Sequence, residues 1–250
     1  MFVNLNMLAL LILMSVFVFI GMKRAENLGY QEIRSLPPID AFDEAISRAA
    51  EMGKPVLYHC GGIPLSMYTI PGVSLLGHVA ELCIDKGAHL IVTAADPVLF
   101  VALEDVMTTA YIKKEVPVEN MDVRFLAGSY FSYAAAVQGL MMRETPAAHF
   151  LMGETDCQLI VYTETGTRIG AFQIGGTAGT WNLPMMAVTC DYTLIGEEFL
   201  AAGAVIANDV SHLGTLVGQD WSKTLVVILL LLGSLLTQLE IPLITQLLKI

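Results

Sequence analysis

Residues able to do chemistry follow four short apolar segments of the chain. The first segment ends at His59 and Cys60, which precede the pair Gly61-Gly62. If the segments are neighbouring parallel strands, their ends meet at the carboxyl edge of one sheet, where open α/β sheets bind ligands. A small-molecule site, if the chain has one, is therefore predicted at these ends. Its candidate residues are His59, Cys60, Gly61, Gly62, Thr93, Asp96, Gly128, Ser129, Tyr130, Gly153 and Glu154.

Two of these ends have the composition of a loop that cradles an anion. Gly61-Gly62 and Gly128-Ser129 would let backbone N–H groups at a helix N-terminus approach a negative charge. Neither end matches G-x-G-x-x-G or a P-loop, and no lysine follows either one. The sequence therefore favours ordinary strand-to-helix turns at both places.

A thiol nucleophile is the second possibility. Cys60 could be activated by His59 and a carboxylate such as Asp96. Adjacent residues of a strand point to opposite faces, so His59 and Cys60 cannot cooperate if the strand continues through Cys60. The five histidines show neither H-x-x-x-H nor H-E-x-x-H spacing. We therefore predict no catalytic residue, no metal ligand and no cofactor.

The segment Gly175–Thr180, with sequence GGTAGT, resembles a phosphate cradle in composition. It follows a predicted hairpin strand and not the first strand of a βαβ unit, and Trp181 and Pro184 close it. A structural turn is the favoured interpretation.

The elements that would position these residues alternate between helix and strand. Two strand–helix–strand units of similar length predict a parallel sheet with right-handed crossovers. The fold class is therefore α/β, a mostly parallel Rossmann-like sheet with helices on both faces. The expected helices are 41–52, 73–86, 97–114 and 130–143, and the expected strands are 56–59, 89–93, 123–128 and 149–152.

The C-terminal third has a different pattern. Alternation over 158–163 and 168–174, around the turn 164–167, predicts a β-hairpin. Residues 185–189 fit a strand or the start of a helix equally. A helix over 192–202 and a short strand over 204–207 complete the predicted domain.

Apolar runs lie at both ends of a chain that is 55% hydrophobic and only 15% charged. The run 5–22 is about 27 Å long as a helix, close to the hydrocarbon thickness of a bilayer. A cleaved signal peptide is the alternative, but no base precedes the run and Met22-Lys23-Arg24 is a poor cleavage site. The second run is 224–250. We predict a transmembrane anchor at 1–24, an α/β domain at 25–222 and a transmembrane helix at 223–250.

The bases beside these runs predict an orientation. Lys23, Arg24 and Lys223 flank the central domain, and only Lys249 lies at an outer end. The positive-inside rule then places the domain in the cytoplasm at the cell membrane. Four widely spaced cysteines agree with a reducing compartment. Glu240 either reaches the far headgroup layer or pairs with a neighbouring helix in an oligomer.

Charge limits the partners of the central domain. Residues 25–222 carry 9 bases and 23 acids, a net charge of −14. Such a domain is not expected to bind nucleic acid or to lie against anionic lipid. The lipid bilayer would instead be contacted by the two apolar ends and their flanking bases.

Four segments resemble an uncharacterised family of membrane-anchored prokaryotic proteins, and the resemblance covers residues 37–223. The family is a domain of unknown function, Rossmann-like and without assigned catalytic residues, so the resemblance implies no site. The matching segments are DEAISRAAEMGKPVLY, DVRFLAGSYFSYAAAVQGLMMRETPAAHFLMG, CDYTLIGEEFLAAGA and LGTLVGQDWSK.

Three classes of function remain open. The first, which we favour, is a non-catalytic membrane scaffold or assembly protein that forms a homo-oligomer through its α/β domain. The 13 methionines and the run Ala134–Ala136 suit an adaptable surface packed against identical neighbours, although a large core would explain them as well. The second class is a small-molecule-binding or sensing domain that uses the strand-end crevice. The third is a membrane-bound enzyme with an unfamiliar motif.

Overall fold

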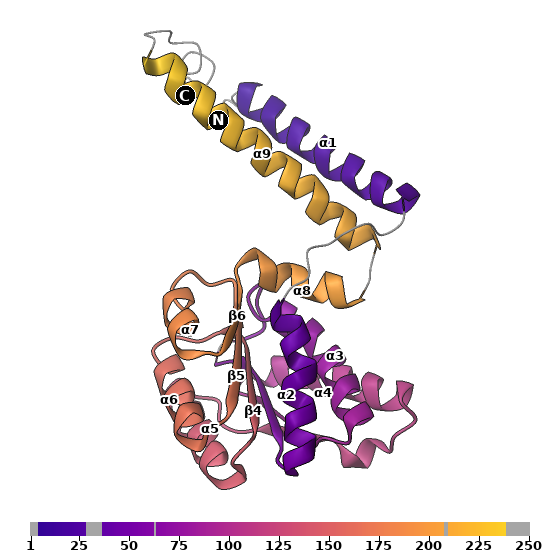
Figure 1. Cartoon of the computed structure of the whole chain (residues 1–250), viewed down its shortest axis with the longest axis vertical. Coiled ribbons are helices and arrows are strands. Elements are labelled where there is room, and N and C mark those ends of the chain that lie inside the picture. The colour runs from indigo at the N-terminus through magenta and orange to yellow at the C-terminus, as the bar shows by residue number, and fades with distance from the viewer. Residues whose placement is uncertain (1–4, 29–36, 63, 208–209, 239–250) are drawn as a thin grey trace. The chain divides into compact units, whose positions relative to one another are not determined.

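The computed structural model describes residues 5–28, 37–62, 64–207 and 210–238 (Figure 1). The chain divides into two compact units. One unit is formed by residues 34–206 and the other by residues 1–33 together with 207–250. The first contains the predicted α/β domain, and the second contains both apolar ends.

The α/β domain is built on one six-stranded sheet in which every paired strand is parallel, with the order β3-β2-β1-β4-β5-β6. The central strands are almost wholly buried because helices cover both faces. The strands are β1 (Val56–Gly61), β2 (Leu90–Ala94), β3 (Asp122–Phe125), β4 (Ala148–Glu154), β5 (Phe172–Thr177) and β6 (Tyr192–Ile195).

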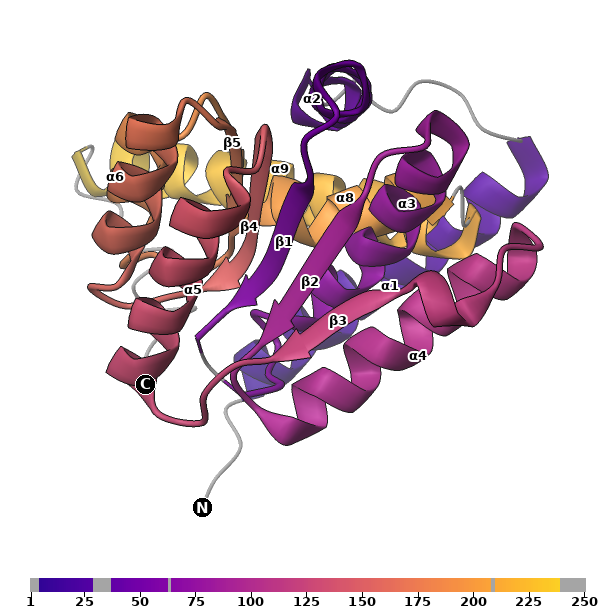
Figure 2. The ribbon, with the colours of Figure 1, turned by 90° about the horizontal axis from the view of Figure 1, so that it is seen from below.

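Two helical layers cover the sheet, as Figure 2 shows for α3 and α4 on one side and α5 and α6 on the other. The larger core lies under α2 (Pro37–Met52), α3 (Ile70–Lys86), α4 (Pro97–Lys113) and α8 (Glu197–Ala207). The smaller core lies under α5 (Tyr130–Glu144), α6 (Leu159–Ile169) and α7 (Leu183–Thr189). The short 3-10 helix η1 (Val118–Asn120) precedes β3. The predicted parallel α/β sheet with helices on both faces is therefore confirmed.

The predicted hairpin over 158–174 is wrong. Its first half is helix α6, which ends at Gly170 in a left-handed conformation with φ of 73°, and β5 then pairs parallel to β4. Three threonines favoured strand in the sequence, yet Leu159, Tyr162 and Gly166 have the i, i+3, i+7 spacing of one buried helix face. The threonine hydroxyls bond carbonyls one turn earlier, as in Thr163 to Leu159 at 3.0 Å.

The remaining C-terminal elements also differ from the prediction. Residues 192–202 are not one helix, because β6 ends at Ile195 and Gly196 (φ 56°) separates it from α8. The expected strand 204–207 is the end of α8, and residues 185–189 lie within helix α7. Gly175 and Gly176, expected in a loop, belong to β5, where the side chains of Met186 and Phe199 occupy the space above them.

The second unit pairs two helices, α1 (Leu5–Leu28) and α9 (Val210–Gln238), which lie side by side (Figure 1). The helices approach closely at Gly218, where a Cβ atom would lie 2.5 Å from the Val18 Cα atom. Within the described residues, no helix is both long and apolar enough to cross a membrane. The two transmembrane segments therefore stay a prediction, and Glu240 and Pro242 lie outside the described residues.

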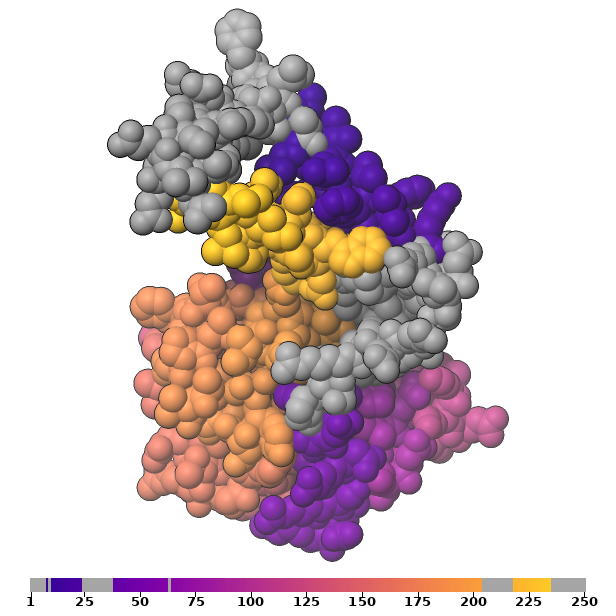
Figure 3. Space-filling view, turned by 45° about the horizontal axis from the view of Figure 1, so that its top comes forward, coloured from indigo at the N-terminus to yellow at the C-terminus, as the bar shows by residue number. Residues whose placement is uncertain are grey.

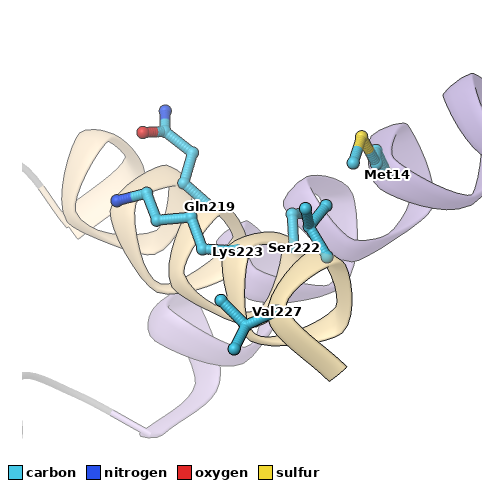
Figure 4. A pocket seen from close by; sticks show the side chains of 6 residues that line it. Met14, Gln219, Ser222, Lys223 and Val227 are labelled. Atoms are coloured by element: carbon cyan, nitrogen blue, oxygen red, sulfur yellow. The ribbon is translucent and has the colours of Figure 1, made fainter. Parts of the chain in front are cut away.

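A shallow groove of about 410 Å³ runs along this helix pair. Figure 4 shows Met14 of α1 across from Ser222 and Val227 of α9, with Gln219 and Lys223 at the polar end of the groove. The Lys223 Nζ atom lies 3.1 Å from a carboxylate oxygen of Asp220. The charged groups of α9 are thus gathered in the turns that precede its aliphatic run.

Candidate functional site

His59 and Cys60 lie on opposite faces of β1, as the alternation of the strand predicted. His59 packs against the rings of Tyr133 and Tyr162 under α5 and α6, while Cys60 belongs to the core on the other face. Both side chains are fully buried, and burial raises the pKa of the Cys60 thiol. The two residues cannot form a nucleophile and base.

His59 instead joins a buried polar network with His149 of β4. The Gln173 Nε2 atom donates to the Thr163 carbonyl at 3.0 Å, so the Gln173 Oε1 atom accepts from the His149 Nδ1 atom at 3.2 Å. His149 Nε2 is then an acceptor, and the His59 Nε2–H group donates a hydrogen bond to it at 2.9 Å. The hydrogen bonds therefore fix one neutral tautomer for each ring.

Both imidazoles are held neutral by the core. Burial lowers the pKa of His149 to about 4, and burial together with the neighbouring His149 lowers the pKa of His59 well below its usual value. The His59 Nδ1 lone pair has no partner among the described residues. Sequence reasoning missed the pair because the contact depends on the pairing of β1 with β4, in which His149 lies opposite Leu57, two residues from His59.

Asp96 and Thr93 are occupied by structural contacts. The Asp96 carboxylate caps α4 by accepting from the backbone N–H groups of Val98 and Leu99 at 3.0 and 2.9 Å. Thr93 shares a hydrogen bond of 2.9 Å with the buried Tyr133 hydroxyl. Both side chains are thus used in hydrogen bonds within the domain.

Glycines close the gap between the carboxyl ends of β1 and β4. A Cβ atom on Gly61 would collide with the Glu154 carbonyl oxygen, and one on Gly153 would lie 2.8 Å from the Cys60 carbonyl carbon. Gly72 of α3 likewise allows the Met152 carbonyl to approach. These glycines allow close backbone packing between β1 and β4. The strand order of the sheet reverses at this point, because β2 and β3 lie on one side of β1 and β4, β5 and β6 lie on the other. The sequence favoured a strand-to-helix turn at Gly61, whereas the structure places Gly61 in β1 against the backbone of Glu154.

The loops that precede α5 and α6 are linked by polar contacts. Gln158 donates to the Tyr130 carbonyl at 2.8 Å, and the Tyr130 hydroxyl is hydrogen-bonded to Asp156. A Cβ atom on Gly62 would lie 2.6 Å from the Gln158 amide oxygen. Ser129 is exposed and bonds Ser132 at 2.7 Å, while a Cβ atom on the neighbouring Gly128 would meet nothing within 4 Å. The structure thus joins the candidates at 62 and 130 through Gln158.

Polar groups without protein partners gather beyond β4 and β5. Both polar atoms of the Asn182 side chain and the hydroxyl of Thr155 are buried and unbonded within the described chain. The Glu154 carboxylate lies against Gly179, where a Cβ atom would be 2.8 Å from its Oε1 atom. Partial burial and the nearby Asp156 raise the pKa of Glu154. We call Glu154, Thr155, Asp156, Gly179 and Asn182 the edge site.

Of the edge site, sequence reasoning offered Glu154 as a ligand-binding candidate and interpreted the segment that contains Gly179 as a structural turn. Thr155 and Asp156 could have been included because they directly follow a predicted strand. Asn182 gave no such signal, since the segment before it was read as a hairpin and a turn. In the described part of the chain, no three His, Cys, Asp or Glu side chains are grouped to hold a metal ion.

Comparison with known proteins places the chain in a family. The model of a domain of unknown function (DUF6754) matches residues 2–248, so the chain belongs to this family. The predicted membership of an uncharacterised family is therefore confirmed. No curated protein and no solved structure matches the chain.

Proposed function

We propose that this member of the DUF6754 family is a membrane-held, non-catalytic assembly protein. Its α1 and α9 helices would lie in the bilayer, and its α/β domain would associate with identical copies. The observation that carries the proposal is the arrangement of side chains on the helix pair: many large aliphatic residues face outward, and among the described residues of the pair only Gly21 and Gly218 are buried.

The contact between α1 and α9 depends on glycine. Gly218 faces the backbone of α1, where a Cβ atom would lie 2.8 Å from the Phe17 carbonyl oxygen, and Gly21 is buried. Helices pair through small residues in lipid, because lipid chains solvate leucine as well as another leucine does. A helix pair in water would bury its large aliphatic side chains between the helices.

The outward faces of this pair are instead aliphatic. Thirteen large apolar side chains on the two helices are 40–67% exposed. A continuous apolar surface of this kind is costly in water and favourable in hydrocarbon. The side chains are Leu8, Leu11, Ile12, Leu13, Val16, Phe19 and Ile20 of α1 and Val227, Ile228, Leu229, Leu230, Leu231 and Leu232 of α9.

The polar ends of the helices support a cytoplasmic position for the domain. Lys23 stands 5.1 Å from the ring centre of Phe19 in the last part of α1, and Trp221 and Lys223 precede the aliphatic run of α9. Aromatic and basic residues are typical of the membrane–water interface, and bases favour the cytoplasmic side. Lys23 lies in the last part of α1, and Trp221 and Lys223 lie in the first half of α9, so both positions are towards the helix ends that are nearer in sequence to the α/β domain.

Exposed apolar residues on the α/β domain support association between copies. Val188 of α7 is 85% exposed, and Trp181, which shortly precedes α7, is 72% exposed. Figure 3 shows the orange surface of the part of the chain that includes α7 and β6. The neighbouring β6 is the outermost strand of the sheet, and its Tyr192 and Ile195 are 40% and 43% exposed. A free strand edge beside apolar side chains suits symmetric pairing with a second copy.

A ligand-binding domain held at the membrane is the second candidate. The observation that favours it is the edge site, because natural proteins rarely leave buried polar side chains without partners. An enzyme is less well supported, since His59 and Cys60 are separated by the sheet and Asp96 caps a helix.

Cys157 provides a natural reporter for the side of the membrane. It is exposed, whereas Cys60 and Cys83 are buried and burial raises the pKa of Cys190 to about 11. We expect a membrane-impermeant maleimide to leave the protein unlabelled in intact cells and to label it after permeabilisation. The labelled chain should be recovered with the membrane fraction and analysed by mass spectrometry.

The Cys157→Ser variant is the control for this experiment and should lose most of the label in permeabilised cells. Equal labelling of Cys157 before and after permeabilisation would contradict the cytoplasmic placement. A buried thiol that reacts as fast as Cys157 would show instead that the domain had opened during the treatment.

A further inference from the structure

The edge site combines unpartnered polar groups with two carboxylates, of which Asp156 accepts a hydrogen bond from the Tyr130 hydroxyl. Four buried side-chain polar atoms lack a partner among the described residues, and three of them belong to Thr155 and Asn182. Both side chains have no exposed surface. They lie in the loops that follow β4 and β5, which are adjacent strands. Because the two loops are neighbours, one partner that is not part of the chain could satisfy both side chains.

The charge of the edge site selects the kind of partner. Glu154 and Asp156 flank Thr155, and the ion pairs formed by the described lysines and arginines do not include either carboxylate. The repulsion between them is one reason why the pKa of Glu154 is raised, so a positive charge placed between them would be stabilised. A phosphate or carboxylate would be repelled by the same two groups.

Local geometry keeps the Glu154 carboxylate within reach of the second loop. It lies beside Gly179, whose missing side chain leaves room for it. The backbone N–H of Asn182 donates to the Gly179 carbonyl at 3.2 Å, so Asn182 lies one turn from the same position. One small molecule could therefore contact the carboxylate and the amide together.

We infer that the edge site binds a small ammonium-bearing molecule that also carries a hydroxyl or carbonyl oxygen. Its ammonium group would be held by Glu154 and Asp156. Its oxygen would accept from the Asn182 Nδ2 atom, and its remaining donors would reach Asn182 Oδ1 and the Thr155 hydroxyl. This inference deepens the second candidate function, and it does not depend on attachment to a membrane.

Ethanolamine is a suitable probe, since it carries one ammonium and one hydroxyl group. Thermal unfolding of the full chain in detergent would be followed with ethanolamine, with ethylene glycol and with sodium chloride at equal concentration. We expect ethanolamine to raise the unfolding midpoint by about 2 °C or more, and the two reference solutes to have a smaller effect.

Thr155→Val separates binding from folding. The valine has the shape of threonine but no buried hydroxyl, so the free variant should unfold at a higher temperature than the wild type. The same variant should lose at least half of the ethanolamine response, as should Glu154→Gln. Thr180→Val is the matched control, because Thr180 is exposed in the loop after β5, and it should respond as the wild type does.

Three results would overturn the inference. The first is an ethanolamine response no larger than that of ethylene glycol or sodium chloride. The second is an undiminished response in Thr155→Val. The third is a free Thr155→Val variant that is less stable than the wild type, because its hydroxyl would then already have a partner. None of these results bears on the membrane proposal, which is tested by fractionation and labelling.

Discussion

Replacing Gly61 by alanine is expected to destabilise the α/β domain by about 4 kcal/mol or more, enough to unfold most single domains at 37 °C. Gly61 has φ of +85°, which an L-residue rarely adopts. Its added Cβ atom would also lie 2.8 Å from the Glu154 carbonyl carbon. Because that atom belongs to the backbone of β4, no side-chain rotation can relieve the collision. The midpoint of urea unfolding, followed by circular dichroism, measures the loss.

Gly87→Ala is the matched control for Gly61→Ala. Gly87 ends α3 with φ of +70°, but a Cβ atom there would meet nothing within 4 Å. The free energy of unfolding should therefore fall by only about 1 kcal/mol, the cost of holding an L-residue in the left-handed conformation. Equal losses in the two variants would mean that the close approach of β1 to β4 contributes nothing.

Acid is expected to remove about 3 kcal/mol of stability through His149 alone as the pH falls from 7 to 4. The folded protein holds the pKa of His149 at about 4, whereas the unfolded chain has the ordinary value near 6.5. The unfolded state therefore binds protons first, so the stability is fully present above about pH 6.5 and is lost towards pH 4. His59 acts in the same direction, because its pKa is also lowered.

The free energy of unfolding at four values between pH 7 and pH 4 measures this effect. His89→Gln is the control, because His89 is mostly exposed and bonds Asp122. This variant should lose as much unfolding free energy between pH 7 and pH 4 as the wild type does. Replacing His59 and His149 together by leucine should flatten the curve over this range. A flat curve in the wild type would show that the two rings are not held neutral. Nitrogen NMR of the wild type provides a second test. We expect it to find His149 as the neutral Nδ1–H tautomer, and any other form of the ring would agree with a flat curve.

The sequence was most informative where local signals agreed with tertiary packing. Helices α3, α4 and α5 follow Gly- or Asp-terminated apolar strands, and their positions were predicted to within a few residues. Gly87 marks the end of α3 as its type suggests. The order of the strands could not be read from local pattern, because pairing between β1 and β4 joins residues about 90 apart.

Errors arose where propensity and periodicity disagreed. The segment 159–169 contains three β-branched threonines and one valine, which favour strand, yet its buried positions repeat with helical spacing. Packing of Leu159 and Tyr162 against β4 and α5 decided the outcome. Tyr192–Ile195 was assigned to the following helix because only Gly196 separates the two elements.

The sequence placed its candidate ligand-binding residues at the carboxyl edge of the sheet, and the structure shows what each of them contacts there. His59, Cys60 and Asp96 were named from their types, yet each is committed to the core or to a helix cap. Thr155 and Asn182 become visible only when burial and hydrogen bonding are known. The sequence alone does not reveal whether a buried polar group has a hydrogen-bond partner, because that depends on tertiary contacts.

Native mass spectrometry of separated aqueous and membrane fractions tests the central proposal most directly. We expect the chain only in the membrane fraction, released by mild detergent as a multiple of its 27.1 kDa mass with lipid attached. This result follows from aliphatic side chains that face outward on α1 and α9 and from the apolar surface beside β6. A lipid-free 27.1 kDa monomer recovered from the aqueous fraction would contradict it.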